Sequence, residues 1–174
     1  MRPLVLLFLI LPLLSVGQAL KDNYYLNSEA GFSIKFDKDW KVKIPEKTTH
    51  PVFAAKSKHQ TISVGLQPVG ADFKPEYTME EADAAKPQIE NALKAKKVII
   101  DKISVTPGIF QGKKCLITIA HLTETRDEDR VPVYHKTIQF VHRGNLFNIL
   151  YNIPLSKLNE KESMEKQLKS MKFF

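Results

Sequence analysis

Three runs rich in β-branched and aromatic residues follow one another between Lys114 and Ile153, a pattern typical of hairpin-connected β-strands. A two-residue turn at Arg143-Gly144 or at Gly144-Asn145 joins the second run to the third. Either turn gives one largely apolar face, at Ile138, Phe140, His142, Phe147, Ile149 and Tyr151. The opposite face is polar, at Thr137, Gln139, Arg143, Asn148 and Asn152. We therefore predict an antiparallel meander with one buried face.

A second alternating pattern spans residues 32–44, with Asp37-Lys38-Asp39 at its centre. We expect a hairpin with this three-residue loop. Its apolar side chains would pair across the strands, Phe36 with Trp40, Ile34 with Val42 and Phe32 with Ile44. The other face would carry Ser33 and a basic stripe of three lysines, Lys35, Lys41 and Lys43.

Residues 52–57 and 61–69 form a further predicted strand pair, joined by a turn at residues 58–60. After a connector, Thr78 and Glu81 have the spacing of a capping box, which predicts a helix that runs to about Lys96. One apolar stripe follows this helix, at Met79, Ala82, Ala85, Ile89, Ala92 and Leu93. Pro87 lies inside the pattern and predicts a kink or the meeting of two helices.

The remaining elements lie on either side of the meander. Residues 98–106 have the pattern of a strand, and Pro107-Gly108 is a turn signal. Ser156 is placed to cap a terminal helix whose apolar residues recur at helical spacing, at Met164, Leu168 and Met171. We expect the rings of the tail Lys172-Phe173-Phe174 to pack against the domain. Together these elements predict an α+β domain, with an antiparallel sheet of about six to seven strands flanked by helices.

The first nineteen residues have the pattern of an export signal, because a short basic start precedes the apolar run Leu4–Val16 and the small residues of Gly17-Gln18-Ala19. As a helix this run would be about 20 Å long, whereas a membrane span needs about 30 Å. We therefore expect cleavage after Ala19 rather than a retained anchor, and export to the periplasm or out of the cell. The mature chain, residues 20–174, would be one domain of 174 − 19 = 155 residues.

The net charge and the cysteine count argue against a nucleic-acid binder and against a disulfide-stabilised fold. The formal net charge is +7 for the whole chain, and 7 − 1 = +6 once the leader with Arg2 is removed. Such a charge favours anionic neighbours, but it lacks the clustered density of a nucleic-acid binder, so no nucleic-acid partner is expected. Cys115 is the only cysteine, which excludes a disulfide framework. We expect a monomer.

Several short segments occur in an informative order. They are Gly31-Phe32-Ser33-Ile34-Lys35-Phe36 followed by Asp39-Trp40, Ala54-Ala55-Lys56-Ser57 before Ile62-Ser63-Val64, the helix start at Thr78 and Glu81, and the closing Leu168-Lys169-Ser170-Met171-Lys172-Phe173. This series resembles the PsbP-type family, which includes the extrinsic photosystem subunit and many exported bacterial proteins of unassigned role. The resemblance implies an α/β/α sandwich around an antiparallel sheet. It carries over no catalytic residue, and it does not transfer the photosystem role.

The chain contains no motif of a common catalytic site. Nucleotide-binding glycine loops, the nucleophile elbow and the zinc-binding HExxH pattern are all absent from the sequence. Cys115 and His121 lie six residues apart on one predicted strand, about 20 Å from each other, so they cannot form a nucleophile–base pair. Cys115 is better interpreted as a small buried hydrophobic residue.

His121 and His135 are weak candidate metal ligands, and their relation depends on strand register. In one register the two imidazoles face each other across the hairpin and could share a metal. In a register shifted by one residue, Ile119 lies opposite Ile138 and more apolar surface is buried. We favour this second register. Two histidines without a third ligand do not make a metal site, so no metal or cofactor is expected.

Two charged clusters are candidate binding sites. Four acidic residues crowd the loop before Val131, at Glu124, Asp127, Glu128 and Asp129. Their spacing matches no recognised calcium loop and two arginines are interspersed, so we expect a solvated hairpin tip. The basic stripe is a candidate partner-binding surface for an acidic protein or an anionic headgroup, at Lys35, Lys41 and Lys43. The alternative is a solvated strand face that protects a sheet edge.

These observations leave three function hypotheses. The leading one is an exported, non-catalytic module that docks on an envelope protein. The second is a small-ligand carrier, with an apolar pocket between the sheet and the helix predicted at residues 78–96. The third is an enzyme, which only scattered histidine, cysteine and acidic residues support.

Overall fold

The computed structural model describes residues 18–45, 50–126 and 129–174. Within these ranges the chain forms eleven β-strands, two α-helices and one 3-10 helix. In chain order the elements are β1 Gln18–Lys21, β2 Tyr24–Asn27, β3 Phe32–Lys35, β4 Lys41–Lys43, β5 Val52–Ala55, β6 Thr61–Pro68, α1 Met79–Ala95, β7 Ile99–Phe110, β8 Lys113–Arg126, β9 Asp129–His142, β10 Asn145–Pro154, η1 Leu155–Glu160, α2 Lys161–Lys169 and β11 Lys172–Phe173. The predicted leader lies almost entirely outside the described residues, and its expected cleavage point after Ala19 falls inside β1.

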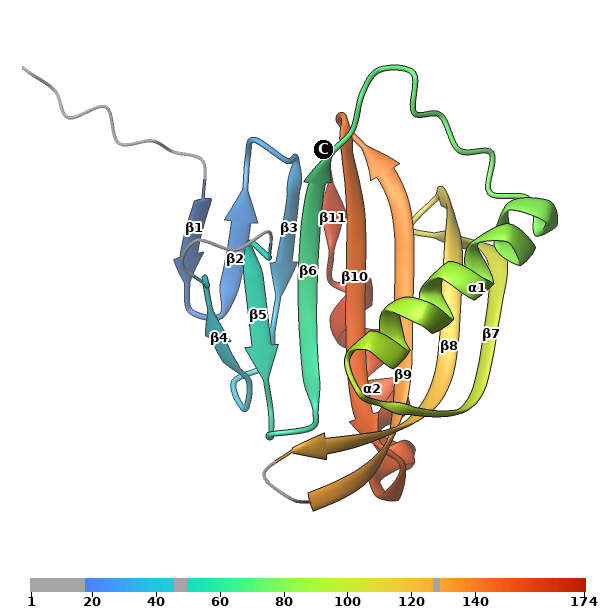
Figure 1. Ribbon diagram of the computed structural model, residues 1–174. Helices are drawn as coiled ribbons and strands as arrows, with labels where there is room; N and C mark the ends of the chain where they lie inside the picture. The colour runs from blue at the N-terminus through green and yellow to red at the C-terminus, as the bar shows by residue number, and fades with distance from the viewer. Residues whose placement is uncertain (1–17, 46–49, 127–128) are drawn as a thin grey trace, which may run out of the picture.

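The strands form two antiparallel sheets (Figure 1). The larger sheet has seven strands in the order β4-β5-β6-β10-β9-β8-β7, and the smaller has four in the order β1-β2-β3-β11. The predicted α+β class and the seven-stranded antiparallel sheet are therefore confirmed. The smaller sheet was not expected, because its strands have only four residues or two and β11 comes from the far end of the chain.

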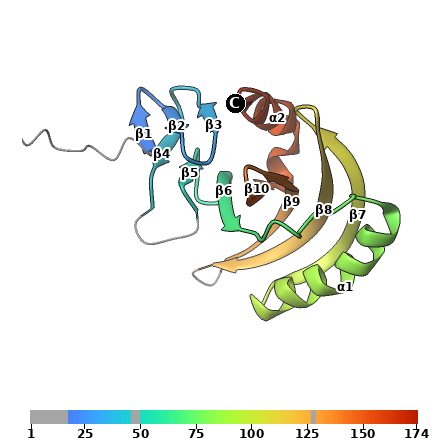
Figure 2. The ribbon, with the colours of Figure 1, turned by 90° about the horizontal axis from the view of Figure 1, so that it is seen from above.

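The layers are visible from above in Figure 2. α1 lies on one side of the large sheet, whereas α2 and the small sheet lie on the other side. Between the two sheets and α2 is the main core, where Phe32 and Leu168 pack with Phe147. A smaller core lies under α1, where Leu93 packs with Leu122. This is the α/β/α layering that the PsbP resemblance implies, with the small sheet added beside α2.

The predicted hairpin at residues 32–44 is wrong. β3 pairs with β2 and β11 in the small sheet, whereas β4 pairs with β5 in the large sheet. The chain crosses between the sheets at residues 36–40, where the Asn23 amide donates to the carbonyl oxygens of Asp37 and Trp40 at 3.0 and 3.1 Å. The rings of Phe36 and Trp40 still meet, at 5.9 Å between centroids, but as core side chains on either side of a crossover.

The meander is confirmed, and of the two possible turns the chain uses Arg143-Gly144. Both turn residues have positive φ, 48° and 67°, as the tight hairpin turn requires. Phe147 then pairs with Phe140, and their rings stack at 5.1 Å. The strand pair predicted from residues 52–57 and 61–69 is also present, as β5 and β6.

The turn predicted at Pro107-Gly108 is wrong, because β7 runs through both residues to Phe110 and the chain turns at Gln111-Gly112. β7 is an edge strand, so a proline can lack its N–H there without breaking the sheet. Gly108 serves a packing purpose instead, since a Cβ at this position would lie 2.5 Å from the Ile117 side chain.

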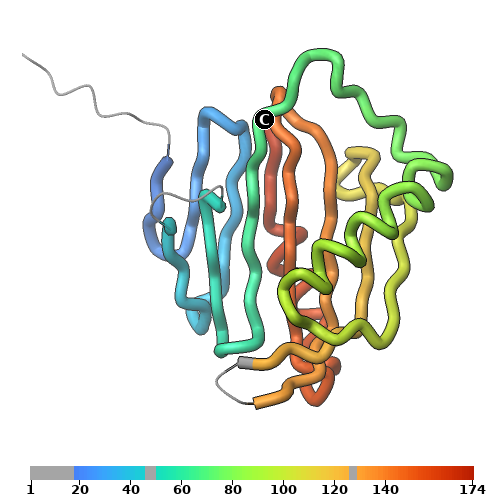
Figure 3. Tube along the Cα trace, in the orientation of Figure 1, coloured from blue at the N-terminus to red at the C-terminus, as the bar shows by residue number. Residues whose placement is uncertain are grey.

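The helix predictions are confirmed in part. The capping box of Thr78 and Glu81 opens α1, which continues through Pro87 as one helix rather than two. Figure 3 shows the connector from β6 arching over the top of the sheet to reach α1. The predicted cap at Ser156 is wrong, because this residue lies inside η1 and α2 begins after Glu160. The predicted apolar stripe of the terminal helix is nevertheless buried, at Met164, Leu168 and Met171.

The C-terminal tail packs as predicted at Phe173 but not at Phe174, which is 49% exposed. β11 pairs with β3, and the Phe173 ring lies 5.2 Å from that of Phe140 and 5.6 Å from that of Phe147. The tail therefore connects the small sheet to the main core.

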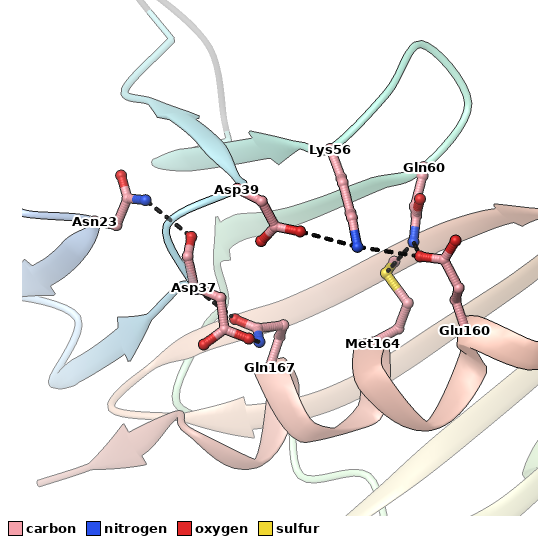
Figure 4. Close-up of polar contacts among 8 residues, drawn as sticks. All are labelled: Asn23, Asp37, Asp39, Lys56, Gln60, Glu160, Met164 and Gln167. Carbon is pink, nitrogen blue, oxygen red and sulfur yellow. Dashed lines mark hydrogen bonds and ion pairs between the residues drawn. The ribbon is translucent and has the colours of Figure 1, made fainter.

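A polar cluster fixes α2 against the rest of the fold (Figure 4). The Gln167 amide exchanges two hydrogen bonds with Asp37, through the backbone N–H and the carboxylate of that residue. Lys56 bridges Asp39 at 2.9 Å and Glu160 at 3.2 Å. These contacts join the β3–β4 crossover, the β5–β6 turn and both ends of the α2 region.

Candidate docking surface

Only two of the three stripe lysines share a face. In β4, Val42 packs on the main core, so Lys41 and Lys43 point to the opposite side of the large sheet. In β3, Ile34 packs on the same core from the small sheet, so Lys35 points away from it on the other side of the molecule. All three lysines are exposed, but the continuous stripe was a consequence of the wrong hairpin.

We call the surface that includes Lys41 and Lys43 the lysine face. Its residues alternate with core residues along β4, β5 and β6, and they are Lys41, Lys43, Phe53, Ala55, Thr61, Ser63, Gly65 and Gln67. This set contains two cations and no carboxylate. α1 lies toward the β7 end of the sheet, and no helix of the described ranges covers β4–β6 in Figure 1. The lysine face is therefore electrostatically suited to an acidic surface.

Two hollows mark this face. The larger, of about 360 Å³, is lined by Lys43, Pro45, His50, Phe53 and Ser63, and the Lys43 ammonium lies 5.2 Å from the Phe53 ring. The smaller, of about 120 Å³, shares His50 and is lined mainly by β6, β9 and β10. In its wall the buried Asn148 Oδ1 has no hydrogen-bond partner among the described residues. The lysine face and its two hollows therefore present two ammonium groups, one aromatic ring and one amide oxygen that can accept a hydrogen bond from a partner.

The two histidines considered as metal ligands do not face each other. The observed register places His121 opposite Tyr134 and His135 opposite Ala120, so the imidazoles lie on opposite faces of the sheet. Both predicted registers are wrong, because the pairing is displaced by one residue in the other direction. Within the described ranges there is no group of three or more histidine, cysteine or acidic side chains that could hold a metal ion.

His135 instead belongs to a buried chain of hydrogen bonds. Its Nδ1–H donates to Asn152 Oδ1 at 2.8 Å, and the Thr137 hydroxyl donates to Nε2 at 3.0 Å. Asn152 in turn donates to Glu124 at 3.4 Å. Burial lowers the pKa of His135 below its ordinary 6.5, even though the bond to Asn152 and the charge of Glu124 act to raise it. The imidazole is therefore neutral and doubly hydrogen-bonded, with 6% of its residue surface exposed, which is typical of a structural network.

The other candidates from the sequence, Cys115 and Glu124, also lie in structural positions. Cys115 is fully buried in the main core, as expected of a small hydrophobic residue, and burial raises the pKa of its thiol. Of the acidic loop, Asp127 and Glu128 lie outside the described residues. Glu124 is half-buried and bonded to Asn152, so it does not belong to a solvated tip.

The apolar pocket expected under the helix of residues 78–96 is occupied by side chains. Ile89 and Leu93 of α1 pack there with Ala120, Leu122 and Val133. Phe140 and Ile149 are fully buried on the opposite face. An apolar pocket does exist, but it lies on that opposite face, beside α2. None of the helices in the described ranges is long and apolar enough to cross a membrane.

Sequence reasoning missed the contributions of His50, Phe53 and Gly65 to the lysine face. A usable signal was present in β6 alone, where large apolar residues alternate with smaller or polar ones, whereas β5 shows no such alternation. That alternation indicates a shared outer face once the pairing of β4 with β5 is known.

The fold and the comparisons define the structural class: this is a PsbP-like α+β domain. The protein is similar to cyanobacterial PsbP from Synechocystis sp. PCC 6803, with a TM-score of 0.61 and 12% identity, over 94% of this chain and 99% of that one. It is also similar to a protein from Bacteroides thetaiotaomicron VPI-5482, with a TM-score of 0.53 and 11% identity, over 89% of this chain and 49% of that one. The sequence matches no family model and no curated protein at a significant level.

Proposed function

We propose that this protein is an exported, non-catalytic binding module that docks on an acidic surface of a cell-envelope protein through the lysine face. The observation that carries the proposal is the composition of this face, which presents Lys41 and Lys43 and no carboxylate. The PsbP-like fold supports it, because the resemblance implies an accessory protein without catalytic residues. The leader pattern of residues 1–19 supports the location.

The physical basis of the docking is charge complementarity over a partly apolar surface. Two lysines at the edge of a sheet steer an acidic partner and set its orientation. The Phe53 ring, half-buried beneath Lys43, supplies apolar contact area in the wall of the larger hollow. Because exposed charges are screened by salt, the association should weaken as ionic strength rises.

The test is crosslinking in the native cell envelope, followed by native mass spectrometry of the complex. The variant Lys41→Glu/Lys43→Glu should lose the partner that the wild-type protein retains. Lys35→Glu is the matched control, because it reverses an exposed lysine on the opposite side of the molecule, and it should keep that partner. If the double variant retains the same partner at the same yield, or if Lys35→Glu loses it equally, docking through the lysine face is wrong.

A further inference from the structure

A further hollow lies on the side of the large sheet opposite the lysine face. It occupies about 440 Å³ between the tip of the β7–β8 hairpin, β9 and α2. We call it the α2 pocket, and its lining residues are Ile109, Phe110, Gln111, Lys136, Ile138, Glu165, Leu168 and Lys169. This size is within the range of about 300–1,000 Å³ that is usual for small-molecule sites.

The path of the strands explains why the pocket exists. β8 and β9 stop pairing at Leu116 and Gln139, although both strands continue beyond this point. The β7–β8 hairpin tip thus leaves the plane of the sheet and curves toward α2 (Figure 2). Gln111 at the tip reaches α2, where its side-chain amide donates to the Lys169 carbonyl at 3.1 Å. The hollow is therefore a product of the fold with walls from three elements.

The inner wall of the pocket is apolar. Leu168 is 2% exposed, Ile138 is 2% exposed, and the Phe110 ring lies 5.9 Å from that of Phe140. Ile109 at the outer rim is 76% exposed, the highest value among the large hydrophobic residues of the described ranges. A ligand that covers Ile109 would remove this apolar surface from water, which is favourable.

The charged groups that line the pocket are one carboxylate and two ammonium groups. Glu165 accepts from the Lys136 ammonium at 3.1 Å and from the Tyr151 hydroxyl at 3.1 Å. Burial acts to raise the pKa of Glu165, but the hydrogen bond and charge of Lys136 outweigh it and hold this pKa below its ordinary value. The carboxylate is therefore ionised and neutralised by Lys136. Lys169 adds a second cation, so the pocket has a net positive charge.

We propose that the α2 pocket binds an anionic amphiphile with a single alkyl chain, such as a fatty-acid carboxylate. The alkyl chain would lie along Phe110, Ile138 and Leu168, and the carboxylate would face the Lys169 ammonium at the rim. A charge-assisted contact at the rim and apolar burial inside match the two halves of such a molecule. This activity is separate from docking, because the pocket and the lysine face lie on opposite sides of the large sheet.

Isothermal titration calorimetry of the purified protein with decanoate, below the micellar range, tests the proposal. Two matched pairs of variants localise the binding. Ile109→Asp changes the pocket rim, and Ile99→Asp changes an exposed isoleucine at the other end of the same strand. Lys169→Glu changes the pocket charge, and Lys166→Glu changes another exposed lysine in the same last turn of α2 that does not line the pocket.

The wild-type protein should bind one decanoate, and the neutral analogue 1-decanol more weakly. Lys169→Glu and Ile109→Asp should each weaken decanoate binding roughly threefold to tenfold, the range expected when one exposed contact becomes a charge repulsion. Lys166→Glu and Ile99→Asp should bind like the wild type. The absence of saturable decanoate binding would overturn the proposal, as would equal losses in the control variants. Equal affinities for decanoate and 1-decanol would overturn the assignment of an anionic ligand.

Discussion

The Tyr77 hydroxyl has a role that one substitution can test. It lies where β8 and β9 separate, and it accepts the backbone N–H of Val141 at 2.7 Å. That N–H belongs to β9 beyond the last residue pair with β8, so no strand neighbour accepts it. Tyr77 has a φ of 58°, which is uncommon for a residue with a Cβ. The side chain of Tyr77, which precedes α1 in the chain, therefore supplies the hydrogen bond that a neighbouring strand would otherwise make to Val141.

Tyr77→Phe removes the acceptor and keeps the ring. Leaving a buried backbone N–H without a partner costs about 1–3 kcal/mol. For a domain of this size each kcal/mol lowers Tm by roughly 2–4 °C, so we expect a fall of about 2–12 °C. Because the site is only partly buried, water can reach it and the lower half of this range is expected.

The assay is urea unfolding combined with amide hydrogen exchange measured by NMR. In Tyr77→Phe the amide of Val141 should lose protection more than its neighbours in β9. Tyr24→Phe, at a residue that is 42% exposed, is the control and should change stability by less than about 0.5 kcal/mol. Unchanged protection of the Val141 amide together with unchanged stability would refute the role assigned to the hydroxyl.

Three further predictions concern other parts of the fold. Gly108→Ala should destabilise by about 1 kcal/mol in urea unfolding, because the new methyl overlaps only the Cδ1 end of the half-buried Ile117 side chain; an unchanged midpoint would contradict this packing. Burial lowers the pKa of His135 in the folded state, so the stabilisation from its neutral imidazole is complete above pH 6.5 and is lost as the pH falls through the folded-state pKa. The free energy of unfolding, measured from pH 8 to pH 5, should therefore fall less in His135→Gln than in the wild-type protein. Lys56→Met should cost at most about 1 kcal/mol, and less at high salt, because its bridge to Glu160 is partly exposed; thermal melts at two salt concentrations check this.

Elements whose determinants are local could be predicted from the sequence. The capping box at Thr78 and Glu81 fixes the start of α1 through bonds within one turn. Gly144 fixes the β9–β10 turn, because the tight turn needs positive φ there. Period-two alternation correctly places Lys41 and Lys43 on one face of a strand. The sequence therefore predicts the two lysines of the candidate docking surface but not the residues of β5 and β6 that share their face.

The partner of a strand is not a local property. Apolar and polar residues alternate over residues 32–44 as they would in a hairpin, yet β3 and β4 belong to different sheets. A short strand can pair with any sheet edge that the packing of the core leaves uncovered. The separation of Lys35 from the other two lysines follows from this crossover alone. The α2 pocket depends likewise on a hairpin tip and a helix about 55 residues apart in the chain.

Register is the clearest case of a feature that only the tertiary structure decided. Both faces of β8 are partly apolar, with Ile117 and Ile119 on one and Ala120 and Leu122 on the other, so burial in the hairpin alone does not choose between registers that differ by one residue. Two different cores make the choice, α2 and the small sheet packing on one face and α1 on the other. The sequence by itself determined most of the strands, the start of α1 and the turn at Gly144, because each depends on neighbouring residues. The sheet to which each strand belongs, the pairing of β8 with β9 and the positions of both proposed sites depend on which layers meet, and the tertiary structure alone decided them.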